Sequence, residues 1–424
     1  MKYLIKNGRV IDPANSVDDT LDILTSDGKI AKIAAKLEAK ADKIIDAKDK
    51  IIAPGLVDMH VHLREPGRED KETVKTGTAA AIEGGFTTIV CMPNTEPPLD
   101  NPKIIRTLKE IIKKDALAEV LITGAITENR FGEKLTNFKA MKKEGIIAVS
   151  DDGSSVDKEK LMLEALKAAK KAHLVLIDHC EDRQISGRGV INQGFMSTKM
   201  GLRGMPRESE YERVKRDIEL AAKTSSRVHI AHVSCKETVE IIRKAKKKGV
   251  SVTAETAPHY FTLTESCCVT YDTNTKMNPP LRTEEDIAAI KEGLRDGTID
   301  VIATDHAPHT DSEKDVEFDF APFGIIGLET ALSLAIMELV DKKIISLNEL
   351  IMKMSVNPSR ILGIDRGTLK EGSVANVVVF DPGEKYVYKR EAIESKSKNS
   401  PFIDWELKGR VQAVFVNGHE IHRH

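Results

Sequence analysis

The stretch Leu56-Val57-Asp58-Met59-His60-Val61-His62-Leu63 is an apolar segment that carries two histidines two positions apart. It follows the apolar residues Ile51–Gly55, and such a run is typical of a strand buried by its neighbours. Side chains two apart in a strand point to the same face, so His60 and His62 are expected to converge on one point. Two neutral imidazoles on one face are half of a metal site, although many strands carry two histidines by chance.

Seven further apolar runs follow this one along the chain. They are Thr87–Pro93, Val120–Thr127, Ile146–Asp151, Leu174–Cys180, Val228–Val233, Val250–Ala257 and Val301–Thr304. Between them lie charged segments with helical periodicity, namely Glu69–Glu83, Pro102–Lys114, Lys158–Lys171, Glu208–Ala222, Lys236–Lys248, Glu284–Arg295 and Leu328–Val340. Eight apolar strands alternating with helices predict an α/β fold, a (β/α)8 TIM barrel. The alternative is a doubly wound open sheet, which usually has a glycine-rich phosphate loop after its first strand, and the sequence has none there.

Both ends of the chain have a different pattern. Residues 1–55 contain short strand-like pieces broken by turns such as Asn7-Gly8, and residues 364–424 contain the apolar runs Gly372–Phe380 and Val411–Gly418. We expect 1–55 and 364–424 to pair into one discontinuous β-sandwich domain beside a barrel formed by residues 56–363.

Composition narrows the classes of partner and of location. The chain of 424 residues has 64 Lys and Arg against 66 Asp and Glu, so its net charge of -2 argues against a nucleic-acid partner. No run of about 18 apolar residues exists, which argues against a membrane span. The first residues are too short and too charged a stretch for a signal peptide. The five cysteines are odd in number and scattered, as is typical of a reducing cytosol, so we expect a cytoplasmic protein.

Polar residues gather where the predicted strands end. They are His60 and His62 on the first strand, Asp151 and Asp152 on the fourth, His179 on the fifth, His232 on the sixth and Asp305 on the eighth. Singly, a strand-end aspartate usually caps a helix, and a lone buried histidine is usually a satisfied core residue. Together they would share the barrel rim where barrel enzymes place their active sites. Four histidines and two or three aspartates suit two divalent ions, most simply zinc.

Such a pair of ions suggests hydrolysis of an amide-like bond. Two ions ~3.5–4 Å apart can share a hydroxide and polarise a carbonyl. Asp305 is the candidate catalytic residue, because a carboxylate there can accept the nucleophile's proton and return it to the leaving nitrogen. Arg64, two residues after His62, can hold a carboxylate with two hydrogen bonds. Asn94, Asn278 and His309 are further candidates to bind substrate, although turn asparagines and a loop histidine are their ordinary alternatives.

Several motifs resemble one known family. Asp58–Gly67 and Ala303–His309 are similar to the two signatures of the dihydroorotases, and more widely to the cyclic amidohydrolases of the amidohydrolase superfamily. Cys91–Thr95, Asp178–Asp182 and His229–Ser234 add to the resemblance, which covers essentially the whole chain. The resemblance implies a (β/α)8 barrel with a β-sandwich from both termini. It also implies the reversible cyclisation of N-carbamoyl-L-aspartate to L-dihydroorotate in pyrimidine (UMP) synthesis, by a metal-bound hydroxide with an aspartate proton shuttle.

The resemblance also assigns roles to individual residues. It implies that His60, His62 and Asp305 hold one zinc, while His179 and His232 hold the other. The substrate-binding residues that it implies are His62, Arg64, Asn94, Asn278, His309 and the backbone of Phe323 and Gly324.

One local feature separates the subfamilies. Many relatives bridge their metals with a carboxylated lysine at the end of the fourth strand, but here that strand reads Gly145–Gly153 and contains no lysine. This resembles the type I dihydroorotases, in which the second aspartate, here Asp152, takes the bridging role. The resemblance implies two Zn²⁺ per chain, with a single well-occupied zinc as the alternative.

Two other readings compete with this one. A hydantoinase or allantoinase is disfavoured by the missing lysine and by Arg64, since those substrates lack the free carboxylate that Arg64 would bind. A catalytically dead scaffold is the other, and such relatives have typically lost metal ligands that this chain keeps. Family resemblance further implies a homodimer and, for some type I enzymes, aspartate transcarbamoylase as a partner.

Overall fold

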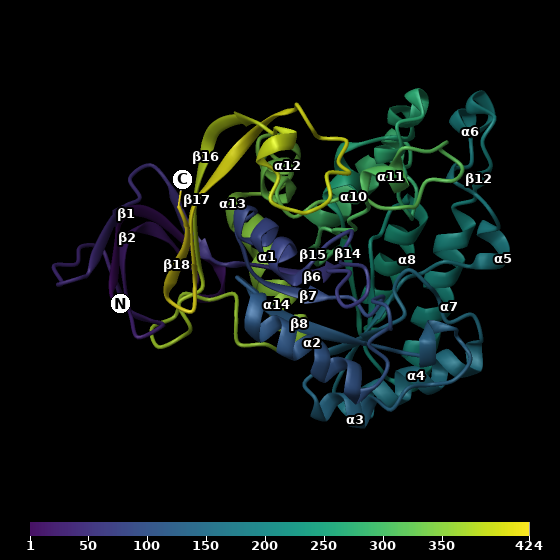
Figure 1. The fold of residues 1–424 in the computed structure, drawn as a ribbon, viewed down its shortest axis with the longest axis horizontal. Coiled ribbons are helices and arrows are strands. Elements are labelled where there is room, and N and C mark those ends of the chain that lie inside the picture. The colour runs from purple at the N-terminus through teal and green to yellow at the C-terminus, as the bar shows by residue number, and fades with distance from the viewer. Residues whose placement is uncertain (424) are drawn as a thin grey trace.

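The barrel predicted from the apolar runs is the larger part of the computed structural model, which describes residues 1–423 (Figure 1). Its eight strands are all parallel and neighbour one another in the order β15-β14-β13-β10-β9-β8-β7-β6. They are β6 (Leu56–Val61), β7 (Phe86–Cys91), β8 (Glu119–Ala125), β9 (Ala148–Ser150), β10 (Val175–Asp178), β13 (Val228–Ile230), β14 (Val252–Thr256) and β15 (Val301–Ile302). A bridge between Val61 and His306 brings the two edge strands together, which confirms the predicted barrel.

Helices cover the outside of these strands. The main ones are α1 (Val74–Glu83), α2 (Pro102–Asp115), α3 (Phe138–Lys143), α4 (Glu159–Ala172), α7 (Glu208–Thr224), α8 (Lys236–Lys247), α10 (Glu284–Arg295), α12 (Ala331–Ala335), α13 (Leu347–Ile351) and α14 (Asn357–Leu362). Helix α2 shows why they form: Asn101 caps its first turn through the amides of Lys103 and Ile104. Its side chains Ile105 and Leu108 are buried against the barrel.

Both chain ends meet in a second, mostly antiparallel sheet, drawn in purple and yellow in Figure 1. Its strands are β1 (Tyr3–Asp12), β2 (Val17–Ser26), β3 (Lys29–Ala34), β4 (Lys43–Asp46), β5 (Ile51–Pro54), β16 (Val377–Val387), β17 (Glu406–Val416) and β18 (His419–Arg423). The sheet has its own apolar core, in which the rings of Tyr3 and Phe415 lie 5.2 Å apart. The predicted fold class is therefore confirmed. The limits 1–55, 56–363 and 364–424 stay a prediction, and His424 lies outside the described residues.

Some helix limits differ from the prediction. The segment predicted as Glu69–Glu83 is helical only from Val74, because Thr73 caps that helix and the residues before it form turns. The segment Leu328–Val340 contains α12 followed by a π-helical turn at Ile336–Val340. Among residues 1–423, no helix is long and apolar enough to span a membrane.

Two long connections between elements of the barrel contain short helices and strands of their own. Glu181–Arg207 contains α5 (Arg183–Ser186), β11 (Ile191–Asn192), α6 (Phe195–Met200) and β12 (Gly204–Met205). His306–Gly327 contains α11 (Asp311–Lys314).

Candidate active site

The strand ends bring six of the predicted side chains together. His60 lies in β6 and His62 directly after it, while Asp305 comes three residues after β15. His62 Nε2 lies 3.0 Å from Asp305 Oδ1, and His60 Nε2 lies 3.5 Å from the same oxygen. These three side chains form one set of nitrogen and oxygen atoms close enough to share a metal ion.

Asp152, which follows β9, lies at the centre of the cluster. Its Oδ1 is 3.3 Å from His60 Nε2, 3.5 Å from His179 Nδ1 and 3.5 Å from His232 Nε2. Its Oδ2 is 3.4 Å from His62 Nε2. One carboxylate therefore faces all four histidines, with Oδ1 toward three of them and Oδ2 toward His62.

The donor atoms fit divalent metal ions. Within residues 1–423, His60 Nε2 and Asp152 Oδ1 are buried and make no hydrogen bond. Buried polar atoms without a partner are costly, and pairing with a metal removes that cost. His179 Nδ1 and His232 Nε2 lie 2.8 Å apart, so two ring nitrogens also point into the same space. Imidazole nitrogens and carboxylate oxygens together are typical zinc ligands.

In three of the histidines, the ring nitrogen that points away from the cluster lies within hydrogen-bond distance of another side chain. His60 Nδ1 lies 2.6 Å from Glu255 Oε1, and His62 Nδ1 lies 2.8 Å from Asn94 Oδ1. His179 Nε2 lies 3.1 Å from Glu181 Oε2. Such contacts select the tautomer whose other nitrogen is free for a metal.

Glu255 is the functional residue that the sequence analysis missed. It lies within β14 and is 1% exposed, and its second oxygen, Oε2, lies 3.1 Å from His229 Nε2. Burial raises the pKa of Glu255, but the neighbouring His60 and His229 outweigh it and lower that pKa to about 2. A glutamate inside an apolar parallel strand must have a partner, and that was the available signal. His229 also supports the site, through its contact with this glutamate.

Asp151, the other strand-end aspartate, lies outside the cluster. Its Oδ1 accepts hydrogen bonds from the amides of Ile126 and Thr127, and its Oδ2 accepts one from the Thr127 hydroxyl. Its role is therefore to close the turn after β8.

Three residues of the site hold a left-handed backbone without being glycine. They are Arg64, His232 and Asp305, with φ of 61°, 34° and 49°. Such conformations cost about 1–3 kcal/mol each and persist where the surrounding structure enforces them. Here they lie at strand ends, where each aims its side chain at the cluster or at the cavity.

A cavity of about 320 Å³ opens above the cluster. It is lined by His62, Arg64, Asn94, Asp152, Gly153, His179, His232, Asn278, Asp305, Ala307, His309, Pro322, Phe323 and Gly324. All the residues predicted to bind substrate are among them. His60, which is 0% exposed, lies beneath the cavity.

One end of the cavity is cationic. Arg64 Nη2 lies 3.4 Å from His309 Nε2, and burial lowers the pKa of Arg64 only to about 10, so the guanidinium stays charged. His309 Nε2 donates to the carbonyl of Phe323 at 2.9 Å, while Lys71 donates to its Nδ1 at 3.2 Å. Burial, followed by the charges of Arg64 and Lys71, lowers the pKa of His309 to about 2. The ring is therefore a neutral Nε2–H donor.

Two further predicted substrate contacts, Asn278 and Gly324, also have protein partners. The amide nitrogen of Asn278 donates to Glu181 at 2.9 Å, and the backbone N–H of Gly324 donates to the carbonyl of Lys276 at 2.9 Å. Both residues still line the cavity, so they shape it from its wall.

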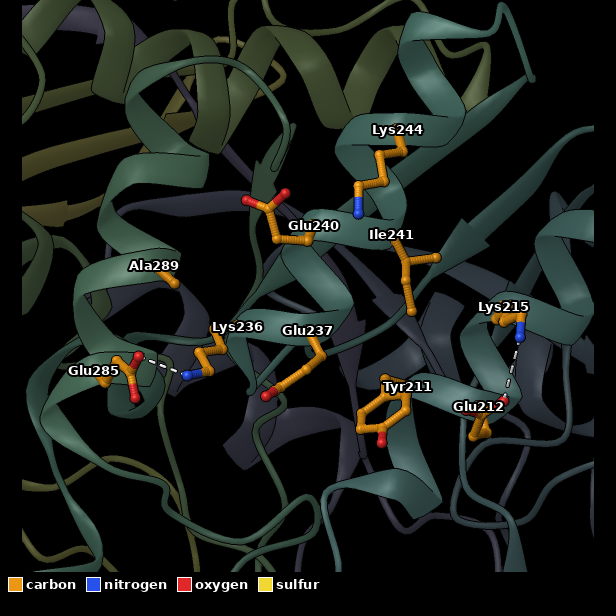
Figure 2. Close-up of a pocket in the computed structure, with 10 residues that line it drawn as sticks. All are labelled: Tyr211, Glu212, Lys215, Lys236, Glu237, Glu240, Ile241, Lys244, Glu285 and Ala289. Atoms are coloured by element: carbon orange, nitrogen blue, oxygen red, sulfur yellow. Dashed lines mark hydrogen bonds and ion pairs between the residues drawn. The ribbon is translucent and has the colours of Figure 1, made fainter.

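A larger hollow on the molecule lacks this chemistry. A groove of about 610 Å³ lies on the outside of the barrel between α7, α8 and α10 (Figure 2). Two ion pairs lie among its charged side chains, Lys236 with Glu285 at 2.5 Å and Lys215 with Glu212 at 3.8 Å. This groove is larger than the rim cavity, but the grouped metal ligands favour the smaller cavity at the rim.

Comparison with known proteins points the same way. Residues 49–238 match a family model described as dihydro-orotase-like. A dihydroorotase from Elusimicrobium minutum is 53% identical over 418 residues, which are 99% of this chain and 97% of that protein. One from Geotalea daltonii is 50% identical over 424 residues and 100% of both chains. Among solved structures, an L-hydantoinase (dihydropyrimidinase) from Arthrobacter aurescens superposes with a TM-score of 0.90 at 25% identity, covering 99% of this chain and 96% of its own.

Proposed function

This chain belongs to the dihydroorotase family, and we propose that its rim cavity interconverts N-carbamoyl-L-aspartate and L-dihydroorotate. The observation that carries the choice of substrate is the cationic end of the cavity, where Arg64 and His309 lie 3.4 Å apart. A guanidinium and an N–H donor suit a carboxylate, which dihydroorotate has and a simple hydantoin lacks.

We assign the ligands of the two proposed metal ions from the distances within the cluster. His60, His62 and Asp305 would hold one ion, His179 and His232 the other, and Asp152 would bridge them. Zinc is the simplest choice for four histidines with two carboxylates. When bound, such ions lower the pKa of a water and polarise a carbonyl.

The residues of the cavity would orient the substrate. Arg64 and His309 hold its carboxylate at one end, which leaves the ring amide to lie over Asp152 and Asp305. Asn94 lies in the cavity wall and fixes His62, so it would restrain both the ring and a ligand histidine. Orienting the amide in this way replaces an encounter in solution by a single bound geometry.

Asp305 is the proposed proton carrier. In hydrolysis it would accept the proton of the attacking water as the carbon–oxygen bond forms. It would then deliver that proton to the ring nitrogen as the carbon–nitrogen bond breaks. Ring closure follows the same steps in reverse. Nearby His60 and His62 outweigh the effect of burial and lower the pKa of Asp305, so the carboxylate starts ionised.

The test compares two substrates on the purified protein. We expect hydrolysis of L-dihydroorotate to exceed that of hydantoin. Arg64→Met should lower kcat/KM for dihydroorotate at least tenfold, because a hydrogen bond to a charged group contributes about 1.5–3 kcal/mol. The same variant should leave any hydantoin hydrolysis unchanged. Activity on hydantoin with none on dihydroorotate would favour the hydantoinase alternative.

Zinc as the metal, its count per chain, the homodimer, the aspartate transcarbamoylase partner and the cytoplasmic location stay predictions. Metal analysis and size-exclusion chromatography, with and without the transcarbamoylase, test the first four.

A further inference from the structure

The connection between β16 and β17 leaves the terminal sheet and reaches the barrel, as the yellow segment between these strands shows in Figure 1. Within it, Ser395, Ser397 and Asn399 are buried, although a surface connection would normally be exposed. Sequence reasoning assigned no role to this segment. Its hydrogen bonds run to the loops that carry the cationic end of the cavity.

Asn399 makes three side-chain hydrogen bonds to those loops. Its Oδ1 accepts from the backbone amide of His309 at 3.1 Å. Its Nδ2 donates to the carbonyls of Ala307 and Gly324, each at 3.1 Å. The Asn399 backbone carbonyl also accepts from the amide of Ile326 at 3.1 Å. The Asn399 side chain, which is 2% exposed, thus connects two segments of the loop after β15.

The groups that Asn399 joins lie at the substrate end of the cavity. Ala307, His309 and Gly324 all line it. The packing there is tight, since Gly324 has a φ of 119° and a Cβ on it would lie 2.6 Å from that of Ala307. A shift of the His309 backbone would therefore move its ring relative to Arg64.

The same segment is bonded to the loop after β6. The Ser397 hydroxyl donates to the carbonyl of Lys71 at 2.7 Å, and the Lys71 side chain contacts His309 Nδ1. The Ser395 hydroxyl donates to Glu72 at 2.5 Å, and Glu72 lies 3.3 Å from His306 Nε2. The segment thus holds both loops that meet at His309.

We propose that Asn399, in the connection between β16 and β17, is a positioning residue. It would hold the backbone of His309 in place and so fix where the His309 ring binds the substrate carboxylate. The inference rests on the proposed function and deepens it, since it assigns part of the carboxylate site to the connection between β16 and β17. Asn399 touches no substrate and acts through the loop. Its loss should weaken substrate binding more than it slows the chemical step.

Asn399→Ala tests the proposal, with Asn376→Ala as the matched control. Asn376 is also buried, at 5% exposed, and its Oδ1 also accepts one backbone amide, that of Asn417, but within the terminal sheet. We expect Asn399→Ala to raise KM for L-dihydroorotate at least tenfold while kcat changes less than threefold. The control should keep the wild-type KM. An unchanged KM in Asn399→Ala would overturn the proposal.

Hydrogen–deuterium exchange gives a readout that needs no activity. Residues 305–309 and 322–326 should exchange faster in Asn399→Ala than in Asn376→Ala. If exchange is faster in Asn399→Ala but the wild-type protein has no activity on dihydroorotate, only the proposed function is refuted. Equal exchange in both variants would refute the positioning role alone. If Asn399→Ala does not fold, Asn399→Asp serves instead, because it keeps the acceptor for His309 and loses both donors.

Discussion

Replacing Glu255 by glutamine should weaken metal binding about tenfold. The carboxylate lies 2.6 Å from His60 Nδ1 and 3.1 Å from His229 Nε2, and its pKa of about 2 keeps it ionised at neutral pH. Glutamine keeps the shape and one acceptor but removes the charge. A hydrogen bond to a charged group contributes about 1.5–3 kcal/mol and a neutral one about 0.5–1.5 kcal/mol. The difference of about 1–1.5 kcal/mol corresponds to roughly tenfold in a binding constant.

Competition with a chromophoric chelator at fixed pH measures this change in Kd. Glu329→Gln is the matched control, because Glu329 is also a buried glutamate but bonds to the backbone amides of Glu394 and Ser395 instead of a metal ligand. We expect the control to bind zinc as wild type does. A zinc Kd within twofold of wild type in Glu255→Gln would refute the reasoning that the charge of this carboxylate strengthens metal binding by His60.

Two other predictions concern the proton carrier and the pH dependence of stability. Asp305→Asn should retain metal but lose at least about 100-fold in kcat, from the usual contribution of acid–base catalysis, and near-normal turnover in a metal-loaded variant would contradict the role. Burial raises the pKa of Glu329 to about 8, so the folded protein binds this proton more tightly than the unfolded chain and is stabilised while Glu329 is protonated. That stabilisation should fall by about 3 kcal/mol between pH 6 and 9 in wild type and not in Glu329→Gln. Thermal melts of both proteins across this range measure the difference in stability between them. A difference that does not change with pH would contradict the prediction.

The sequence predicted the barrel because its strands are buried on both faces and therefore read as continuous apolar runs. Each of the eight runs contains or overlaps an observed strand, as Val301–Thr304 does with β15. The grouping of the candidate metal ligands was predictable for the same reason, since residues at the ends of parallel strands must share one rim. Helix starts were harder, because the cap at Thr73 depends on local turns that periodicity does not describe.

Contacts between distant parts of the chain could not be predicted from local sequence patterns. Glu255 looked like one charge in a strand until its two histidine partners were placed beside it. Asn399 lies 90 positions from His309 in the sequence, and nothing local indicates that they meet. Asp151 and Asp152 have the same residue type and adjacent positions, so only the backbone direction after β9 separates the cluster residue from the turn residue.

The central claim is that two ions are held on either side of Asp152 next to a carboxylate site. Anomalous diffraction at the zinc edge, from crystals grown with zinc and L-dihydroorotate, tests it most directly. We predict two peaks, one near His60 and His62 and one near His179 and His232, with substrate carboxylate density at Arg64. Zinc bound elsewhere, or a substrate whose carboxylate lies away from Arg64, would contradict the account.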